Sequence, residues 1–309
     1  VLYSDTVTLQ PRPLHRPSDD VDLLMGTGNS RWMFKPSVSL PFGMVQIAPD
    51  NEEQKWKAGY EYTIENIAGF NHFCDWTIDG FLMQPTCGPL QVNPGLENNP
   101  DLGYRSRIDK ASEKAVIGKY AVHLTDTDIH AEVSATDRAS IQAYTFPAGC
   151  SEPRVLVDLF TPSEYPHQLQ DAHVTKIGDR EVEGFATYYG SSTGYTAEQY
   201  HTVYFVMQFD RPFTSMGGWV NPRVGDKEQY TRVGNTDAEA GILHGISEVH
   251  GKGDVGFFLN FASAAEATTV KVRTGVSLVD LNGARHNLQT ELAGPYGWDL
   301  EKVAQHARD

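Results

Sequence analysis

The densest group of polar and aromatic side chains in the chain runs from Gly69 to Trp76, with the sequence Gly-Phe-Asn-His-Phe-Cys-Asp-Trp. In an alternating strand, Asn71 and Asp75 share one face, and His72 and Trp76 share the other. An aromatic ring can cover the C–H face of a pyranose while nearby polar groups bind its hydroxyls, so this pattern indicates a sugar-binding pocket. The alternatives are a hydrogen-bonded core position for His72 and a turn-forming role for Asp75.

A second group extends from Trp56 to Tyr62, where an indole and two phenols surround the carboxylate of Glu61. Trp56 is the candidate sugar platform in this group, for the same physical reason. Tyr60 and Tyr62 share one face of a strand and are equally typical of a packed core.

Glu61, between Tyr60 and Tyr62, and Asp75, between Phe73 and Trp76, are the acidic residues surrounded by aromatics. Glycosidases use two carboxyl groups that flank the scissile bond, about 5–5.5 Å apart for retention and about 6.5–9.5 Å apart for inversion. Nothing in the sequence spacing marks these two residues as such a pair, so a self-contained hydrolase is the minor hypothesis. The sequence contains no Gly-x-Ser-x-Gly elbow, no His-Glu-x-x-His and no Asp-x-Asp-x-Asp-Gly calcium loop. The glycines at 26 and 28 lack the lysine of a phosphate-binding loop.

Composition narrows the possible partners. The formal net charge is -15, from 40 acidic and 25 basic residues, and a surface of that sign repels nucleic acids and anionic membranes. No stretch approaches the roughly 18 apolar residues that a membrane span needs. Residues 1–13 lack a signal-peptide pattern, as expected of a mature form whose leader has been removed. The cysteines, an odd number, allow at most one disulfide within the chain and do not decide the compartment: Cys74, Cys87 and Cys150.

Short alternating runs separated by Gly, Pro, Asn and Asp recur from about residue 43 to residue 276, which predicts many antiparallel strands in packed sheets. The nearly continuous apolar runs at 203–209 and 255–261 are typical of strands covered on both faces. We therefore expect an all-β fold, a large antiparallel β-sandwich over residues 1–276.

Helical spacing replaces this pattern over residues 277–309. One apolar stripe runs from Leu281 to Leu292, and a second begins at Leu300 after the breaker Ala293-Gly294-Pro295. Asp299 is a start signal for the second helix, and no Gly or Asn stop follows it. We expect two linker helices that lead into a further domain.

Several segments, in order and spacing, resemble the opening of glycoside hydrolase family 92. They are Val21-Asp-Leu-Leu-Met-Gly-Thr-Gly, Leu40-Pro-Phe-Gly-Met-Val-Gln-Ile-Ala-Pro-Asp50, Ala58-Gly-Tyr-Glu-Tyr, Ile67-Ala-Gly-Phe-Asn-His72, Tyr104-Arg-Ser-Arg-Ile and Asp128-Ile-His-Ala-Glu-Val-Ser-Ala-Thr-Asp-Arg138. Gly297-Trp-Asp is similar to the start of the family's linker helices.

The resemblance implies an exo-α-mannosidase that inverts the anomeric centre, requires calcium and acts on mannose-containing glycans. It implies a sandwich of the supersandwich type, joined by helices to an (α/α)-barrel that supplies the general acid, the general base and the calcium ligands. This chain would then hold no catalytic residue and no metal ligand, and would be inactive alone. It would contribute sugar-binding loops, with these residues as candidates: Trp56, Gly59, Glu61, His72, Asp75 and Trp76. The expected location is secreted, periplasmic or on the cell surface.

The loop after His72 departs from the family pattern, in which many members continue with Thr-His-Leu-Ser-Gly. Because of this difference, the resemblance does not decide the linkage or the leaving group, for which mannose, another sugar and a mannose phosphate are the alternatives. A different class of function is a free-standing carbohydrate-binding module. A domain separated from its partner should expose an apolar flank beside the last helices, whereas an independent module should be polar there.

Overall fold

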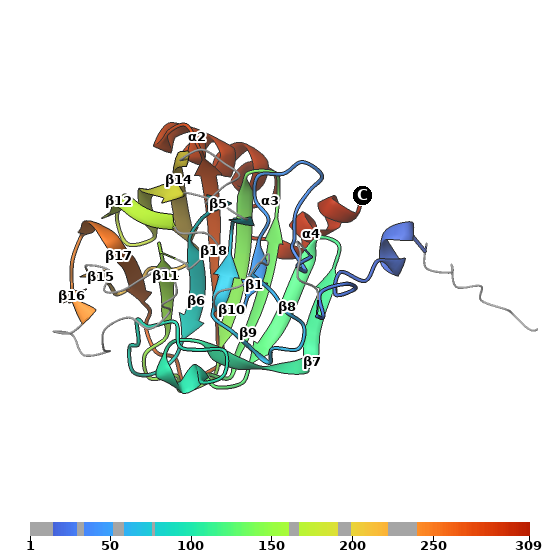
Figure 1. Ribbon diagram of the computed structural model, residues 1–309, viewed down its shortest axis with the longest axis horizontal. Coiled ribbons are helices and arrows are strands. Elements are labelled where there is room, and N and C mark those ends of the chain that lie inside the picture. The colour runs from blue at the N-terminus through green and yellow to red at the C-terminus, as the bar shows by residue number, and fades with distance from the viewer. Residues whose placement is uncertain are drawn as a thin grey trace, which may run out of the picture.

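The computed structural model describes residues 15–29, 34–51, 59–75, 78–160, 167–190, 199–221 and 240–309. Within these residues, antiparallel strands form one continuous 16-stranded sheet and a separate two-stranded one. The large sheet folds over at β17 (Glu248–Asn260), whose first half pairs with β12 (His167–Lys176) and whose second half pairs with β11 (Arg154–Asp158). The result is two stacked layers (Figure 1), so the predicted antiparallel β-sandwich is confirmed.

The first layer follows the order β1-β3-β6-β11-β17 and continues into β15 and β16. These strands are β1 (Ala48–Asp50), β3 (Gly69–Asn71), β6 (Leu82–Thr86), β15 (Ser215–Asn221) and β16 (Ile242–His244).

The second layer follows the order β12-β13-β14-β18-β10-β9-β8-β7, and β2 pairs with β7 at its edge. These strands are β13 (Glu181–Gly190), β14 (Gln199–Phe209), β18 (Thr268–Ser277), β10 (Ala139–Phe146), β9 (Ile129–Ala135), β8 (Lys119–Leu124), β7 (Ser106–Val116) and β2 (Asn66–Ile67). The alternate residues Tyr120, Val122 and Leu124 of β8 are buried in the main core, as their spacing predicts.

The main core lies between the two layers. The ring of Phe81, just before β6, lies 5.0 Å from that of Phe205 on β14. Successive residues of β17 face opposite sides, with Phe257 in the main core and Phe258 in a second cluster on the outside of the first layer. This two-sided cover explains why the strand is an unbroken apolar run rather than an alternating one.

The outer face of the first layer is covered by the segment that joins β6 to β7, which contains the 3-10 helix η2 (Pro100–Leu102). Tyr104 of this segment packs with Leu156, and its hydroxyl donates to Asp158 at 2.7 Å. On the same face, Trp219 donates its indole N–H to Asp254 at 2.9 Å. Outward-facing carboxylates of β11 and β17 are therefore buried beneath this cover and hydrogen-bonded there.

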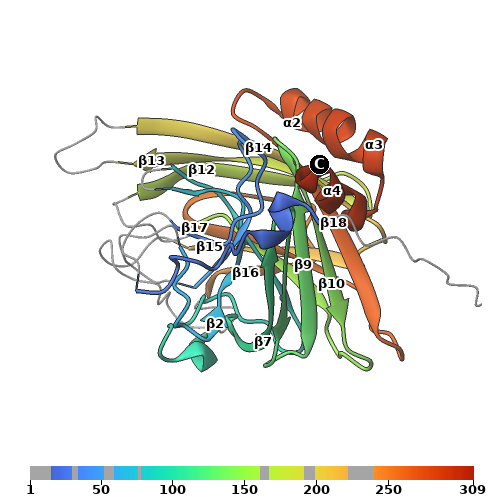
Figure 2. The same cartoon turned by 90° about the vertical axis from the view of Figure 1, so that its right-hand side faces the viewer.

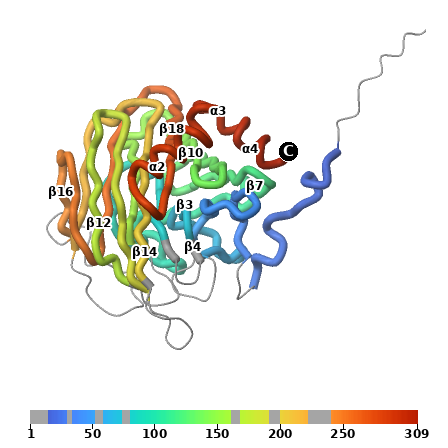
Figure 3. Tube along the Cα trace, turned by 90° about the horizontal axis from the view of Figure 1, so that it is seen from above, coloured from blue at the N-terminus to red at the C-terminus, as the bar shows by residue number. Residues whose placement is uncertain are grey.

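A helical segment packs on the outer face of the second layer, against β18, β10 and β9 (Figures 2 and 3). It comprises α2 (Leu281–Asn287), the π-helical stretch η3 (Leu288–Ala293), α3 (Gly294–Tyr296) and α4 (Leu300–Arg308). The 3-10 helix η1 (Pro17–Asp20) lies near the other end of the chain. The apolar stripes predicted from the sequence form a third cluster with this sheet: Ala284, Leu288, Leu292, Leu300 and Val303.

The break between the helices lies at Gly297, where φ is 59°, and not at Ala293-Gly294-Pro295 as the sequence suggested. The wider turn of η3 accommodates Pro295, which has no N–H to donate, so helix continues through it. The predicted start of α4 is confirmed, because the Asp299 carboxylate accepts from Lys302 N at 3.1 Å.

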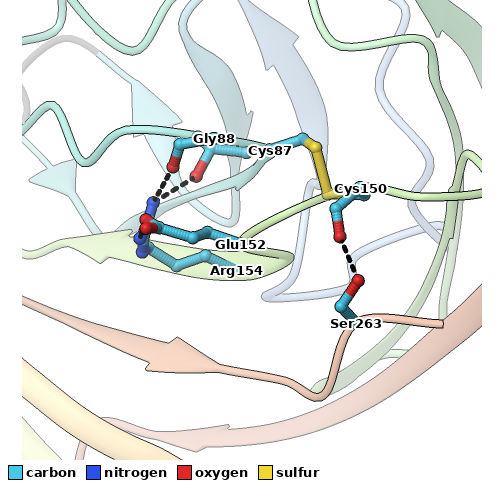
Figure 4. The surroundings of a disulfide bond; sticks show 7 residues. Cys87, Gly88, Cys150, Glu152, Arg154 and Ser263 are labelled. Atoms are coloured by element: carbon cyan, nitrogen blue, oxygen red, sulfur yellow. Dashed lines mark hydrogen bonds and ion pairs between the residues drawn. A yellow bond between two sulfur atoms is a disulfide. The ribbon is translucent and has the colours of Figure 1, made fainter.

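A disulfide joins Cys87, in the loop after β6, to Cys150, just before β11, across 63 positions of sequence (Figure 4). Arg154 fixes the same loop by donating to Gly88 O at 3.1 Å, and its guanidinium also pairs with Glu152 at 2.8 Å. These contacts hold the start of the β6–β7 cover against the first layer.

Candidate functional site

The predicted polar and aromatic group after Gly69 forms one long hairpin that extends beyond the first layer. Strand β3 leads into β4 (Cys74–Asp75), and β5 (Ile78–Asp79) leads back into β6, with Asp75 opposite Ile78. Asp75 is thus the last described residue before the hairpin tip. The side chain of Asp75 and the whole of Trp76 lie outside the described residues, so their sugar-binding role stays a prediction.

His72 lies inside the sandwich rather than on a surface. Its side chain is fully buried, its ring packs on Phe81 with centroids 4.3 Å apart, and its Nε2 lies 2.7 Å from Ser140 Oγ on the opposite layer. Burial lowers the pKa of His72 to about 3, so the ring is neutral at physiological pH. This geometry favours the core alternative for His72 over the predicted contact with sugar, because no face of the ring is open to a ligand.

Glu61 holds two loops together. Its carboxylate accepts from Asn29 N at 2.8 Å and from the Thr63 hydroxyl at 3.1 Å. Its backbone exchanges hydrogen bonds with the side chain of Asn51, at 2.8 and 3.0 Å. Gly59 is buried, has a φ of 89° and accepts from Asn51 N at 2.7 Å. This bond between Asn51 and Gly59 joins the two ends of residues 52–58, which include Trp56 and lie outside the described residues.

A buried network below Glu61 anchors this loop to the second layer. The hydroxyls of Tyr60 and Tyr120 both donate to Glu113 Oε1 at 2.6 Å. Lys110 Nζ lies 2.9 Å from both Tyr60 Oη and Glu113 Oε2, and 4.4 Å from the centroid of the Tyr62 ring. Burial and the adjacent Glu113 raise the pKa of Tyr60 above its ordinary value. Tyr60 therefore has the packing role that the sequence left open. Tyr62 is 44% exposed and does not lie in a strand, so the expectation of a shared strand face was wrong for this pair.

A second buried polar cluster, which the sequence did not reveal, surrounds the end of β1. Asp50 accepts from Asn71 at 3.4 Å, and Arg105 donates its Nη1 to Asn51 O at 2.8 Å and to Asn66 Oδ1 at 2.9 Å. Burial raises the pKa of Asp50 to about 7, although Arg105 and Asn71 act in the opposite direction. The only sign of this cluster in the sequence is the polar run from Asp50 to Lys55, which follows the apolar residues of β1.

The candidate residues fall into two groups at opposite ends of one strand pair. In the antiparallel pairing of β1 with β3, Asp50 lies opposite Gly69 and Ala48 lies opposite Asn71. The loop with Gly59 and Glu61 leaves one end of this pair, and the hairpin with Asp75 leaves the other. Glu61 has a structural role in this arrangement, and its pairing with Asp75 as a catalytic couple stays a hypothesis.

Among the residues that the structure describes, no group of three or more His, Cys, Asp or Glu side chains is placed to hold a metal ion. No helix in that part of the chain is long and apolar enough to span a membrane.

An antiparallel β-sandwich is a rigid scaffold whose loops can carry binding residues, and the fold alone does not define a function. Residues 20–277 match the model of the glycosyl hydrolase family 92 N-terminal domain. The chain therefore belongs to glycosyl hydrolase family 92, as its resemblance suggested.

Solved structures of the same family share the fold. The family GH92 alpha-mannosidase BT3965 from Bacteroides thetaiotaomicron is 23% identical, with a TM-score of 0.74 over 96% of this chain and 38% of that one. The family GH92 inverting mannosidase BT2199 from the same organism is 23% identical, with a TM-score of 0.70 over 94% and 35%. The chain thus spans little more than a third of the length of these relatives. Among curated proteins, no match was found.

Proposed function

We propose that this chain is the sugar-binding N-terminal domain of an inverting exo-α-mannosidase that releases terminal α-linked mannose from glycans. Membership of the family supports glycoside hydrolysis. Mannose as the sugar and inversion as the outcome are supported by two relatives with the same fold, one an alpha-mannosidase and one an inverting mannosidase.

The observation that carries the proposal is an apolar surface at the hairpin end, beside the helical segment. Phe42 is fully exposed, and its loop is held there by two backbone N–H groups that donate to Asp137 O. Leu278 and Val279, which follow β18 on the way to α2, are 47% and 80% exposed. Arg138, which follows Asp137, accepts from Val276 N of β18 with its carbonyl oxygen and pairs with Glu291 of the helical segment, so the Phe42 loop lies next to the end of β18.

Exposed large apolar side chains grouped at one end of a domain mark a surface that another protein or domain covers. This favours a domain that packs against a partner over a free-standing carbohydrate-binding module. The partner in the proposal is a C-terminal (α/α)-barrel of the same protein, which follows the linker helices.

The active site in this proposal lies between the two domains. The barrel supplies a general acid that protonates the leaving oxygen and a general base that removes a proton from the attacking water, so the glycosidic bond breaks as water bonds to the anomeric carbon. This chain contributes Trp56 and the hairpin tip at Asp75 and Trp76 as sugar contacts. Because β1 and β3 are each only 3 residues long, about 10 Å, the connections that leave their opposite ends can reach one glycan. Calcium in this proposal is bound mainly by the barrel.

The Cys87–Cys150 disulfide supports an extracytoplasmic location in the proposal. Disulfides persist in oxidising compartments and are rare in the cytosol, where thiols are kept reduced. A secreted, periplasmic or cell-surface enzyme is consistent with glycans as substrates.

The test compares the full-length protein with the 309-residue chain on an aryl α-mannoside in the presence of calcium. The full-length protein should release mannose, with β-mannose as the first anomer in proton NMR, and the shorter chain should be inactive. An aryl α-glucoside is the matched control. Absence of mannosidase activity, release of α-mannose first, or equal turnover by the shorter chain would each contradict the proposal.

A further inference from the structure

Two histidines lie side by side on the outer face of the second layer, where the large sheet folds over. His173 of β12 is directly opposite His250 of β17 in the pairing of these strands, which are on the left in Figure 1. The next residues, Val174 and Val249, belong to the main core, so the alternation of each strand turns the histidines outward. Both histidine side chains are accessible, with exposures of 39% and 65%.

The two rings are spaced as two ligands of one metal ion would be. Their centroids are 5.4 Å apart. A metal ion about 2.0–2.1 Å from a ring nitrogen lies about 3 Å from the ring centre, so two imidazoles at a tetrahedral metal have centres about 5 Å apart. The strands maintain this spacing, because Cβ atoms of directly opposite residues lie about 4.5–5.5 Å apart.

A carboxylate accompanies each histidine. His173 Nε2 lies 3.2 Å from Glu248, and His250 Nε2 lies 2.9 Å from Asp171. When Nε2 carries the proton and donates to the carboxylate, the lone pair of the ring is on Nδ1. Metal-binding histidines almost always donate their other N–H in this way, which orients the ring and makes it a more basic ligand. Both rings are exposed, so they can turn to direct the two lone pairs at one ion.

The donor atoms select the class of metal. Neutral imidazole suits zinc, copper and nickel, whereas calcium takes oxygen ligands. Asp171, Glu248 and a net charge of -15 attract a divalent cation. Two protein ligands leave the other positions to water, as in an open site. Such a pair differs from a group of three or more metal-binding side chains, of which the described part of the chain has none.

A second pair of opposite histidines provides an internal comparison. His123 of β8 lies opposite His130 of β9, and His123 Nε2 lies 2.7 Å from Asp128. His130 Nε2, in contrast, is 3.9 Å from Glu132, beyond hydrogen-bonding distance. Glu132 pairs with Lys119 at 2.5 Å instead. This pair is therefore the weaker candidate for a metal.

We propose that His173 and His250 together bind one divalent transition-metal ion, such as Zn²⁺, on the outer face of the sandwich. The ion connects β12 of the second layer to β17, the strand that continues into the first layer, and so stabilises the place where the sheet folds over. The inference goes beyond the proposed mannosidase function and does not depend on it, because calcium is a different metal with different ligands.

The test titrates the untagged chain with zinc chloride in a calorimeter, and with calcium chloride for comparison. One Zn²⁺ should bind per chain with a Kd in the micromolar range, and Ca²⁺ should not displace it. Asp171→Asn and Glu248→Gln should each weaken Zn²⁺ binding about tenfold, the effect of losing a carboxylate behind a ligand. His173→Gln and His250→Gln should weaken it more, by about a hundredfold, because each removes one of the two ligands.

Thermal unfolding gives a second readout. At about 100 times its Kd, Zn²⁺ should raise the unfolding temperature of the wild type by about 5 °C, since it binds the folded state. The unfolding temperature of His173→Gln should not respond to Zn²⁺. The matched controls are His123→Gln, in the weaker pair, and His286→Gln, a single exposed histidine of α2, and both should bind Zn²⁺ as the wild type does.

Three results would each overturn the proposal. One is no binding of Zn²⁺ at about 1 mM. Another is binding that His173→Gln and His250→Gln do not weaken, and the third is binding that His123→Gln abolishes. Mannoside hydrolysis by the full-length protein is measured separately, so failure of either proposal is recognised without the other.

Discussion

His72 Nε2 lies 2.7 Å from Ser140 Oγ, and this hydrogen bond joins the two layers of the sandwich through its core. Both residues are fully buried, and the other ring nitrogen of His72 has no hydrogen-bond partner. A charged imidazole in this position would lose its hydration, and burial therefore lowers the pKa of His72 to about 3, although a backbone hydrogen bond with Phe81 acts in the opposite direction.

Acid should therefore destabilise the protein through His72. The folded-state pKa lies below the ordinary value of 6.5, so the contribution of His72 to stability is complete above pH 6.5 and is lost as the pH falls towards 3. The loss reaches several kcal/mol, at about 1.36 kcal/mol per pKa unit. In denaturant unfolding, His72→Leu combined with Ser140→Ala should flatten the profile between pH 6.5 and 4. Ser140→Ala alone is the control, and a double variant as acid-sensitive as the wild type would contradict the assignment.

Asp50 should act in the opposite sense. Burial raises its folded-state pKa from 3.8 to about 7, so its contribution to stability is present below about pH 4 and is lost as the pH rises through 7. Asp50→Asn imitates the protonated carboxyl, and its stability relative to the wild type should rise by about 1–3 kcal/mol between pH 5 and pH 8. The exposed Asp20→Asn serves as the control. A constant difference between wild type and Asp50→Asn across this range would show that Asp50 is already charged at pH 5.

These two residues show how far the sequence could be interpreted. The alternation and the apolar runs predicted the sandwich, because period-2 patterning follows directly from which side of a strand is buried. The same patterning could not tell that His72 points between the layers, since a polar residue on a strand is compatible with either face. The sequence did not predict the cluster of Asp50 with Arg105, because these residues are 55 positions apart. They come together only when the segment between β6 and β7 packs over the first layer.

The break between the helices was predicted at Ala293-Gly294-Pro295, but it lies at Gly297. Here too, the local sequence does not show how the surrounding chain packs. Gly294-Pro295 is a strong local breaker, and only the π-helical stretch before it shows how the chain accommodates the proline. Of the candidate sugar contacts, Glu61 and His72 are bonded within the domain. The roles of Trp56, Asp75 and Trp76 stay predictions from the sequence and the family.

The Cys87–Cys150 disulfide should account for a large part of the stability. It closes a loop of 63 positions, and restricting such a loop in the unfolded chain is worth about 4 kcal/mol in the chain-entropy model. Cys87→Ala with Cys150→Ala should lower the free energy of unfolding by about 2–4 kcal/mol, and a reductant should produce the same loss in the wild type. Cys74→Ala is the control and should keep its sensitivity to reductant. An unchanged unfolding midpoint in reductant would contradict the pairing.

Close packing of the helical segment should depend on Gly275 of β18. A Cβ at this position would lie 2.5 Å from Leu288 Cβ and would also overlap Ala284 O, so α2 and η3 could not approach the sheet. Gly275→Ala should cost about 1–3 kcal/mol and change the fluorescence of Trp298, whose ring is 4.2 Å from the Arg273 guanidinium. Gly28→Ala is the control, because its added Cβ would meet only an ordinary contact at 3.7 Å. Equal effects of the two variants would show that the helices are not held by this approach.

The hairpin tip should determine which leaving group the full-length enzyme prefers. The hairpin of β4 and β5 joins the ends of β3 and β6, and the residues at its tip are among the sugar contacts of the proposed function. Asp75→Ala and Trp76→Ala should lower kcat/KM on a mannobiose about tenfold, the effect of losing about 1.4 kcal/mol of binding in the transition state. Their effect on an aryl mannoside, whose leaving group lacks hydroxyls, should be smaller than twofold on the same scale. Asp179→Ala, in the β12–β13 turn, is the matched control. Unchanged kinetics on every mannoside would remove the tip from the site, and equal losses on both substrates would place it beside the cleaved mannose instead.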